Sequence, residues 1–135
     1  MTLSNDRATA ERCGPTIRKP GVAADALIYA GALVVMKDGF AEPGFTGLGL
    51  VAVGRAEEQV DNTGGADGAR RVKVKAGTFR FDSAASTDAI TKADIGKVAY
   101  ILDDHTVART DGAGTRSPAG PIWDVDAAGV WVRIG

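Results

Sequence analysis

The sequence has few of the residues that metal centres, disulfides and membrane spans require. Cys13 is the only cysteine among 135 residues, so no intrachain disulfide can form. His105 is the only histidine, and one cysteine with one histidine cannot complete a zinc site. The longest apolar run, residues 23–36, is interrupted by Asp25 and Gly31 and is shorter than the ~20 residues that cross a bilayer. We therefore expect no disulfide scaffold, no metal centre and no membrane partner.

An excess of charge of one sign is also missing. Sixteen basic and seventeen acidic side chains give a formal net charge of -1, which provides no general attraction to nucleic acid. The N-terminus has no apolar segment behind a basic start, so we expect no secretory signal peptide. A chain of 135 residues is long enough to form a single domain with its own core.

Glycine, in contrast, is abundant. The chain contains 18 glycines but only 6% aromatic residues, which indicates many tight turns between short elements. From residue 26 onward, short apolar runs follow one another about every ten residues, with turn signals between them. We predict a mainly β domain over residues 26–135, built as a small β-barrel or sandwich.

Two runs show the alternation of a half-buried strand. Residues 71–75 read Arg-Val-Lys-Val-Lys, which places the valines on one face and the cations on the other. Near the C-terminus, the apolar residues of 130–134 face one way, whereas Trp131 and Arg133 face the other. One face must belong to the core, so we expect something else to cover the face with the tryptophan.

One short helix is expected within "SAASTDAITKADIGK". Thr91 and Asp94 have the spacing at which a carboxylate reaches back to the first residue of a helix. Gly96 provides a stop signal. We expect one or two turns, which Ile90 and Ile95 attach to the sheet.

Residues 1–25 are predicted to form an extended N-terminal arm. They contain Pro15 and Pro20 and show no sustained periodicity in their apolar positions. The arm is locally basic through Arg7, Arg12, Arg18 and Lys19. Two interpretations remain open: a solvated, disordered terminus, or an arm that becomes ordered on a partner surface.

The acidic pairs of the sequence are better explained by turns than by chemistry. Asp103, Asp104 and His105 separate two apolar runs, as the loop of a hairpin would, and adjacent residues on a tight hairpin point apart. We therefore predict a turn there, in preference to a cation site or a catalytic trio. Asp124 and Asp126 lack the full spacing of a calcium loop, so a solvated turn is again expected.

The motifs of common enzymes are missing. No serine lies in a Gly-x-Ser-x-Gly elbow, and only one histidine could act as its base. The glycine-rich "NTGGADGA" lacks the Lys-Ser or Lys-Thr pair of a phosphate-binding loop. We expect neither enzymatic activity nor a cofactor.

The main electrostatic feature is a cationic stripe, consisting of Arg70, Arg71, Lys73, Lys75 and Arg80. Phe79 and Phe81 share the parity of three of these cations, and could stack on bases unless Gly77 resets the register. Acidic residues within 57–61 could instead pair with the stripe across strands. We expect a role toward protein and no nucleic-acid partner.

Two long stretches resemble a known family. They are "GLVAVGRAEEQVDNTGGADGARRVKVKAGTFRF" and "ITKADIGKVAYILDDHTVARTDGAGTRSPAGPIWDVDAAGVWVRI". Together they resemble the small capsid decoration, or cement, proteins of tailed bacteriophages and Mu-like prophages, over about residues 28–134. The most recognisable parts are "ADIGKVAYILDDHTVA" and the closing "AGPIWDVDAAGVWVRI".

The resemblance implies a β-rich structural virion protein, made in the bacterial cytoplasm and located on the outer surface of the capsid. Such a protein bridges subunits of the major capsid protein and stabilises the head, commonly as a homotrimer, with a dimer as the other possibility. The basic arm, with Arg7, Arg12, Arg18 and Lys19, would then lie across the capsid.

The same resemblance implies an interface between subunits. Closed symmetry would let the tryptophan-bearing face of one subunit cover that of the next, which assigns Trp123, Trp131 and Arg133 to the contact. The alternative function is a β-rich trimeric head fibre or adhesin. In that case, Trp123 or Trp131 would stack on host glycans.

Overall fold

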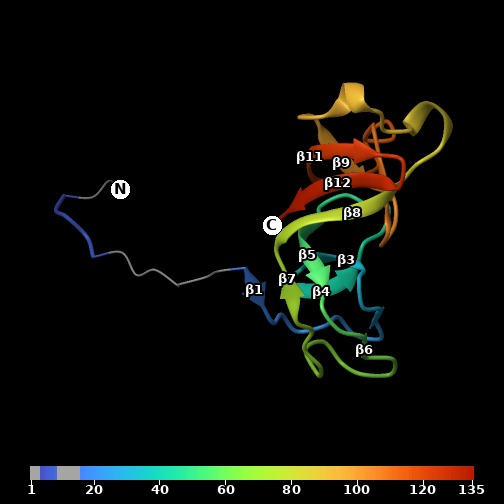
Figure 1. Ribbon diagram of the computed structural model, residues 1–135. Helices are drawn as coiled ribbons and strands as arrows, with labels where there is room; N and C mark the ends of the chain where they lie inside the picture. Colours follow the sequence, from blue (N-terminus) through green and yellow to red (C-terminus); the bar gives the residue numbers. More distant parts are fainter. Residues whose placement is uncertain (1–3, 9–15) are drawn as a thin grey trace.

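A computed structural model describes residues 4–8 and 16–135, and it confirms the prediction of a mainly β fold with a small barrel. The strands form a closed five-stranded barrel, a separate five-stranded sheet and a small two-stranded sheet. In Figure 1 the barrel lies above the five-stranded sheet, and β8 runs from one to the other.

The five-stranded sheet is antiparallel throughout and has the strand order β1-β7-β5-β3-β4. Its strands are β1 (Ile17–Arg18), β3 (Leu33–Lys37), β4 (Phe40–Pro43), β5 (Val51–Ala56) and β7 (Val74–Lys75). Asp38 and Gly39 join β3 to β4 with positive φ angles of 51° and 88°, which is the conformation of a two-residue hairpin turn. The small sheet pairs β2 (Leu27–Ile28) with β6 (Val60–Asp61).

The barrel has the strand order β10-β8-β12-β11-β9. Its strands are β8 (Gly77–Ser83), β9 (Val98–Ile101), β10 (Thr106–Ala108), β11 (Pro118–Asp126) and β12 (Gly129–Ile134). β12 pairs with residues 77–81 of β8, whereas β10 pairs with β8 only at Asp82 and Ser83, in parallel. The contact that closes the barrel is therefore confined to the end of β8.

Two hydrophobic cores lie on opposite faces of the five-stranded sheet. Leu33 and Val35 of β3 belong to the core shared with the barrel, whereas Val34 between them belongs to the second core. The predicted strand faces are confirmed, since the following residues are all fully buried: Val72, Val74, Val130, Val132 and Ile134. Burial of one such side chain contributes roughly 1.5–3 kcal/mol.

Two single turns of 3-10 helix replace the one short helix predicted from the sequence: η1 (Ser86–Asp88) and η2 (Lys92–Asp94). The Asp94 carboxylate accepts the Thr91 N–H at 2.9 Å, as the capping spacing predicts, and Gly96 follows with a φ of 90°. Ile90 is buried, but Ile95 is 43% exposed, so the prediction that both attach the segment is wrong for Ile95. The Gly96 N–H bonds to β11 directly after Ile95, which leaves this side chain outside the barrel.

The folded domain begins earlier in the chain than the predicted boundary at residue 26. β1 pairs with β7 (Figure 1). Val22 is fully buried and bridges to Ala41 of β4. The buried Asn62 amide donates to the carbonyls of Val22, Ala23 and Ala66 at 3.4, 2.9 and 3.0 Å. Residues 16–25 thus belong to the folded domain, because partners between residues 41 and 76 supply their hydrogen bonds.

Candidate interaction surface

The Asp103–His105 segment forms the tip of the β9–β10 hairpin, as predicted. The Leu102 N–H donates to the Thr106 carbonyl at 3.0 Å and closes the turn. The His105 N–H donates to the Asp103 carboxylate at 2.9 Å, so the first acid holds the backbone of the loop.

The prediction that these side chains point apart is wrong. The His105 Nδ1 lies 3.1 Å from an Asp103 carboxylate oxygen and 3.0 Å from one of Asp104. The turn itself causes this, because its backbone bond to Asp103 places that carboxylate beside the imidazole. The three side chains could offer ligand atoms to a cation, but Ca²⁺ takes roughly six to eight oxygens. An imidazole Nδ1–H group between two carboxylates accounts for the geometry without a metal.

This arrangement raises the pKa of His105 above its ordinary value of 6.5, first through the hydrogen bond to Asp104 and then through the charge of Asp103. We expect NMR titration of this single histidine to give a midpoint above 6.5, and Asp104→Asn to lower it. Since the folded pKa is raised, the ion pairs stabilise the fold at low pH, and that stabilisation is lost as pH rises through the folded pKa. An unchanged midpoint in Asp104→Asn, with Asp38→Asn as control, would contradict the assignment.

The three residues predicted to form a subunit interface are Trp123, Trp131 and Arg133. All three lie on the outer side of the barrel, but they differ in exposure and in their contacts. Trp123 occupies a bulge in β11, where the register with β12 shifts, and is 70% exposed. Trp131 is half-buried, and its indole N–H donates to Asp126 at 2.9 Å. Arg133 is exposed on the same side of β12 as Trp131. The bulge thus makes Trp123 the most exposed of the large hydrophobic side chains in the described chain.

Trp123 is part of an exposed apolar area that we call the tryptophan face, made of Ile95, Val98, Pro121 and Trp123. Val98 pairs with Pro121 across β9 and β11. The hydrogen bond from the Gly96 N–H to the Ile122 carbonyl continues this pairing and places Trp123 beside the turn that carries Ile95. Ile95 and Val98 are 43% and 41% exposed. Neighbouring exposed apolar side chains of this kind are typical of protein-binding surfaces.

Asp126 stabilises the β11–β12 turn, which agrees with the predicted turn at this acidic pair. Its carboxylate accepts the Ala128 and Gly129 N–H groups at 2.8 and 3.0 Å. The hydrogen bond from Trp131, followed by these backbone bonds, lowers the pKa of Asp126 below its ordinary value. The carboxylate is thus engaged by the protein itself, and the same bond fixes the indole ring of Trp131.

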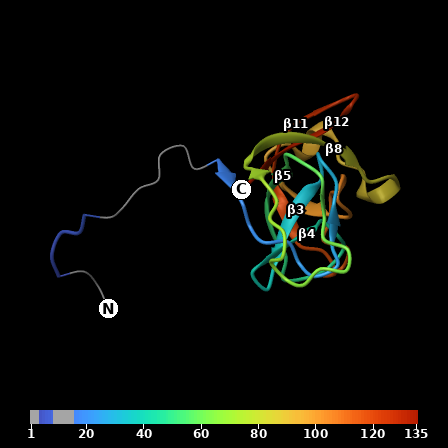
Figure 2. The ribbon, with the colours of Figure 1, turned by 90° about the horizontal axis from the view of Figure 1, so that it is seen from below.

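The four basic residues assigned to the arm have different positions. Arg7 is exposed within residues 4–8, and Arg12 lies outside the described residues. Arg18 belongs to β1, and the carbonyl of Lys19 accepts a hydrogen bond from Arg71 at 3.4 Å. Two of the four cations are therefore on the surface of the domain itself. Figures 1 and 2 show β1 beside the C-terminal end of the chain.

A cationic groove of about 420 Å³ lies where β8 leaves the five-stranded sheet for the barrel. Its lining residues are Gly31, Arg55, Lys75, Thr78, Phe79, Arg80, Phe81 and Trp131. The Arg55 guanidinium carbon lies 4.4 Å from the centroid of the Phe79 ring, and that of Arg80 lies 5.9 Å from the Trp131 ring. Planar cations over aromatic rings are held in place while their remaining N–H groups stay available.

The stripe predicted from the sequence is interrupted at Gly77, and this decides which of its residues reach the groove. Lys75 is exposed, but Phe79 and Phe81 are buried, so the glycine does reset the alternation. Arg55 was not predicted from the sequence, since its place beside Lys75 comes from the pairing between β5 and β7.

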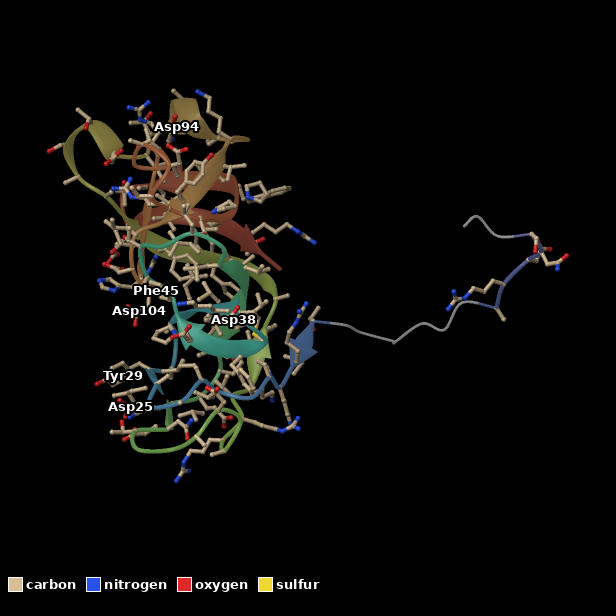
Figure 3. All side chains as sticks on the ribbon, turned by 180° about the vertical axis from the view of Figure 1, so that it is seen from behind. Asp25, Tyr29, Asp38, Phe45, Asp94 and Asp104 are labelled. Carbon is tan, nitrogen blue, oxygen red and sulfur yellow. The ribbon has the colours of Figure 1, made fainter. Side chains whose placement is uncertain are left out.

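A smaller hollow of about 300 Å³ adjoins the groove at Gly31. Tyr29, Asp104 and His105 line it, and Figure 3 shows Tyr29 and Asp104 on the same side of the molecule. The ion pairs at the hairpin tip therefore lie near the cationic groove, so basic and acidic groups share one surface.

Comparison with known proteins gives no relative. No family model, curated protein or solved structure matches this chain. Within the part of the chain that the structure describes, no helix is long and apolar enough to span a membrane.

Proposed function

We propose that this protein is a structural virion protein that binds the outer surface of a tailed-phage capsid, bridges major capsid protein subunits and stabilises the head. The resemblance over residues 28–134 supports this role, and so does the small β-barrel. The proposal includes the absence of enzymatic activity, because the one histidine pairs with carboxylates at an exposed hairpin tip.

The observation that carries the proposal is the tryptophan face. A bulge on a barrel strand presents Trp123 to solvent, with Ile95 and Val98 beside it. Tryptophan on a rigid support is the residue type most enriched at the energetic centres of protein interfaces. A homotrimer is the proposed assembly, and this face would be buried between its subunits.

An assembly that contacts several capsid subunits at once binds the shell more tightly than a single subunit does, through avidity. After one subunit of an assembly binds the shell, the binding of the others becomes intramolecular. Arg18 and Lys19 are held on the domain surface by β1, so each domain has basic side chains where the N-terminal segment enters it. The major capsid protein is the proposed partner of these residues.

Mixing the purified protein with empty capsids tests the function. We expect regular, near-saturating decoration in cryo-electron-microscopy maps, and capsids that rupture at a higher temperature than undecorated ones. Decoration without any gain in heat resistance would contradict stabilisation. No binding to the shell would contradict the proposed function as a whole.

The alternative, a head fibre or adhesin, is favoured by the exposure of Trp123 alone. A ring that is 70% exposed is free to stack on a sugar. The half-buried Trp131 is less suited, since Asp126 and Arg80 already contact its indole. An adhesin would bind host cells or their glycans, and would leave the heat resistance of capsids unchanged.

A further inference from the structure

The cationic groove contains an open strand edge. The Asp82 N–H donates to the His105 carbonyl at 2.8 Å, on the side of β8 that faces β10. Main-chain groups of alternate residues in a strand point to the same side, so Thr78 and Arg80 direct theirs to this edge as well. β10 does not extend along this part of β8, because their pairing begins at Asp82.

No strand replaces β10 along the earlier part of β8. β12 lies on the opposite side of β8, where it pairs with residues 77–81. Within residues 4–8 and 16–135, no main-chain hydrogen bond to Thr78 or Arg80 comes from the β10 side. Both residues line the groove, so their free N–H and C=O groups are available to a molecule that enters it.

The side chains around this edge carry positive charge. Lys75 and Arg80 form no ion pair with a carboxylate of the described residues. Arg55 is partly neutralised by Glu57 at 2.8 Å, and Phe79 supports its guanidinium plane. The groove therefore offers main-chain groups in a strand geometry, surrounded by cations.

We propose that the groove binds an extended acidic segment of a partner protein, which adds to the free edge of β8 as a further strand. Strand addition supplies main-chain hydrogen bonds, and alternate side chains of the added segment reach one face. Acidic side chains on that face would pair with Lys75 and Arg80. This inference rests on the proposed function for the identity of the partner, which would be a capsid subunit.

A nucleic-acid ligand fits this groove less well. Single-stranded nucleic acid is bound by aromatic rings that stack on successive bases. Phe79 and Phe81 are only 9% and 5% exposed, and the Arg80 guanidinium lies over the Trp131 ring. The free main-chain donors and acceptors match a peptide backbone, which nucleic acid does not offer.

The direct test uses a fluorescein-labelled peptide of alternating aspartate and threonine, with a lysine-threonine peptide as its counterpart. We expect the acidic peptide to bind the full-length chain in fluorescence anisotropy and the basic one not to bind. The variant K75E/R80E should bind the acidic peptide at least tenfold more weakly. Lys92→Glu reverses one charge, against two in K75E/R80E, at an exposed site on η2 outside the groove, and should bind like the wild type. Equal binding by all three proteins would overturn the assignment to the groove.

Amide exchange distinguishes strand addition from simple charge attraction. We expect the acidic peptide to slow exchange at the Thr78 and Arg80 amides, which face the groove. The Phe79 and Phe81 amides face β12 and should change little. Peptide binding that leaves Thr78 and Arg80 unprotected would overturn strand addition. Tighter binding of a labelled oligothymidine than of the peptide would overturn the choice of a peptide ligand.

Capsid binding separates this inference from the proposed function. If wild type and K75E/R80E decorate capsids equally, the groove does not carry the contact, whereas the proposed function stands. If the wild type binds the peptide with protected amides but does not bind capsids, the proposed function is overturned, whereas the groove remains a peptide site.

Discussion

Replacing Trp123 with serine is expected to weaken the proposed self-association of the chain by about 30-fold or more, which corresponds to the roughly 2 kcal/mol lost at an interface hot spot. The side chain is 70% exposed in the single chain, so its loss removes little from the core. The melting temperature of the monomer should therefore be nearly unchanged. Sedimentation equilibrium of wild type and variant measures the association constant directly.

Leu48→Ser is the matched control for this prediction. Leu48 is 65% exposed, similar to Trp123, and it lies on the loop before β5, outside the tryptophan face. Its replacement should leave association unchanged. Equal weakening by both substitutions would mean that exposed apolar area in general drives association. A wild type that stays monomeric at high concentration would contradict the tryptophan face as a subunit interface.

Replacing Gly120 with alanine is expected to reduce the free energy of unfolding by about 3 kcal/mol or more. Gly120 has a φ of +156°, and a Cβ at this position would lie 2.0 Å from the Arg133 carbonyl oxygen. That oxygen belongs to β12 of the barrel, so it cannot move without disturbing buried neighbours such as Val132. Urea denaturation followed by tryptophan fluorescence measures the loss.

Gly114→Ala is the control for the steric part of this effect. Gly114 also has a positive φ, of +81°, but no atom lies within 4 Å of a Cβ built there. Only the backbone strain of a left-handed alanine applies, which costs about 1–2 kcal/mol. A similar loss of unfolding free energy in the two variants would mean that β12 moves to accommodate the added methyl group.

Local patterns in the sequence predicted the local parts of the fold. The alternation over residues 71–75 and 130–134 identified the buried valines correctly, because side chains of a strand alternate between its faces. Thr91 and Asp94 formed the expected contact, since they lie only three positions apart along the chain. The hairpin at Asp103 was predicted for the same reason.

The sequence was less informative where a residue's position depends on partners that are far away along the chain. The predicted boundary at residue 26 missed β1, because its pairing partner β7 lies more than 50 residues further along the chain. Ile95 was expected to be buried, but its position outside the barrel depends on a bond from Gly96 to β11. The hairpin side chains converge through a backbone bond that residue spacing does not reveal.

The amino-acid pattern alone was enough to predict a mainly β domain with turns at its glycines, because strand alternation and turn propensity act over a few residues. Which residues meet at a surface depends instead on how distant strands pair and pack. Arg55 joins Lys75 and Arg80 because β5 pairs with β7 and β8 then passes into the barrel. The bulge that exposes Trp123 likewise arises from the register between β11 and β12. Registers of this kind are set by the packing of both cores, which no short stretch of sequence contains.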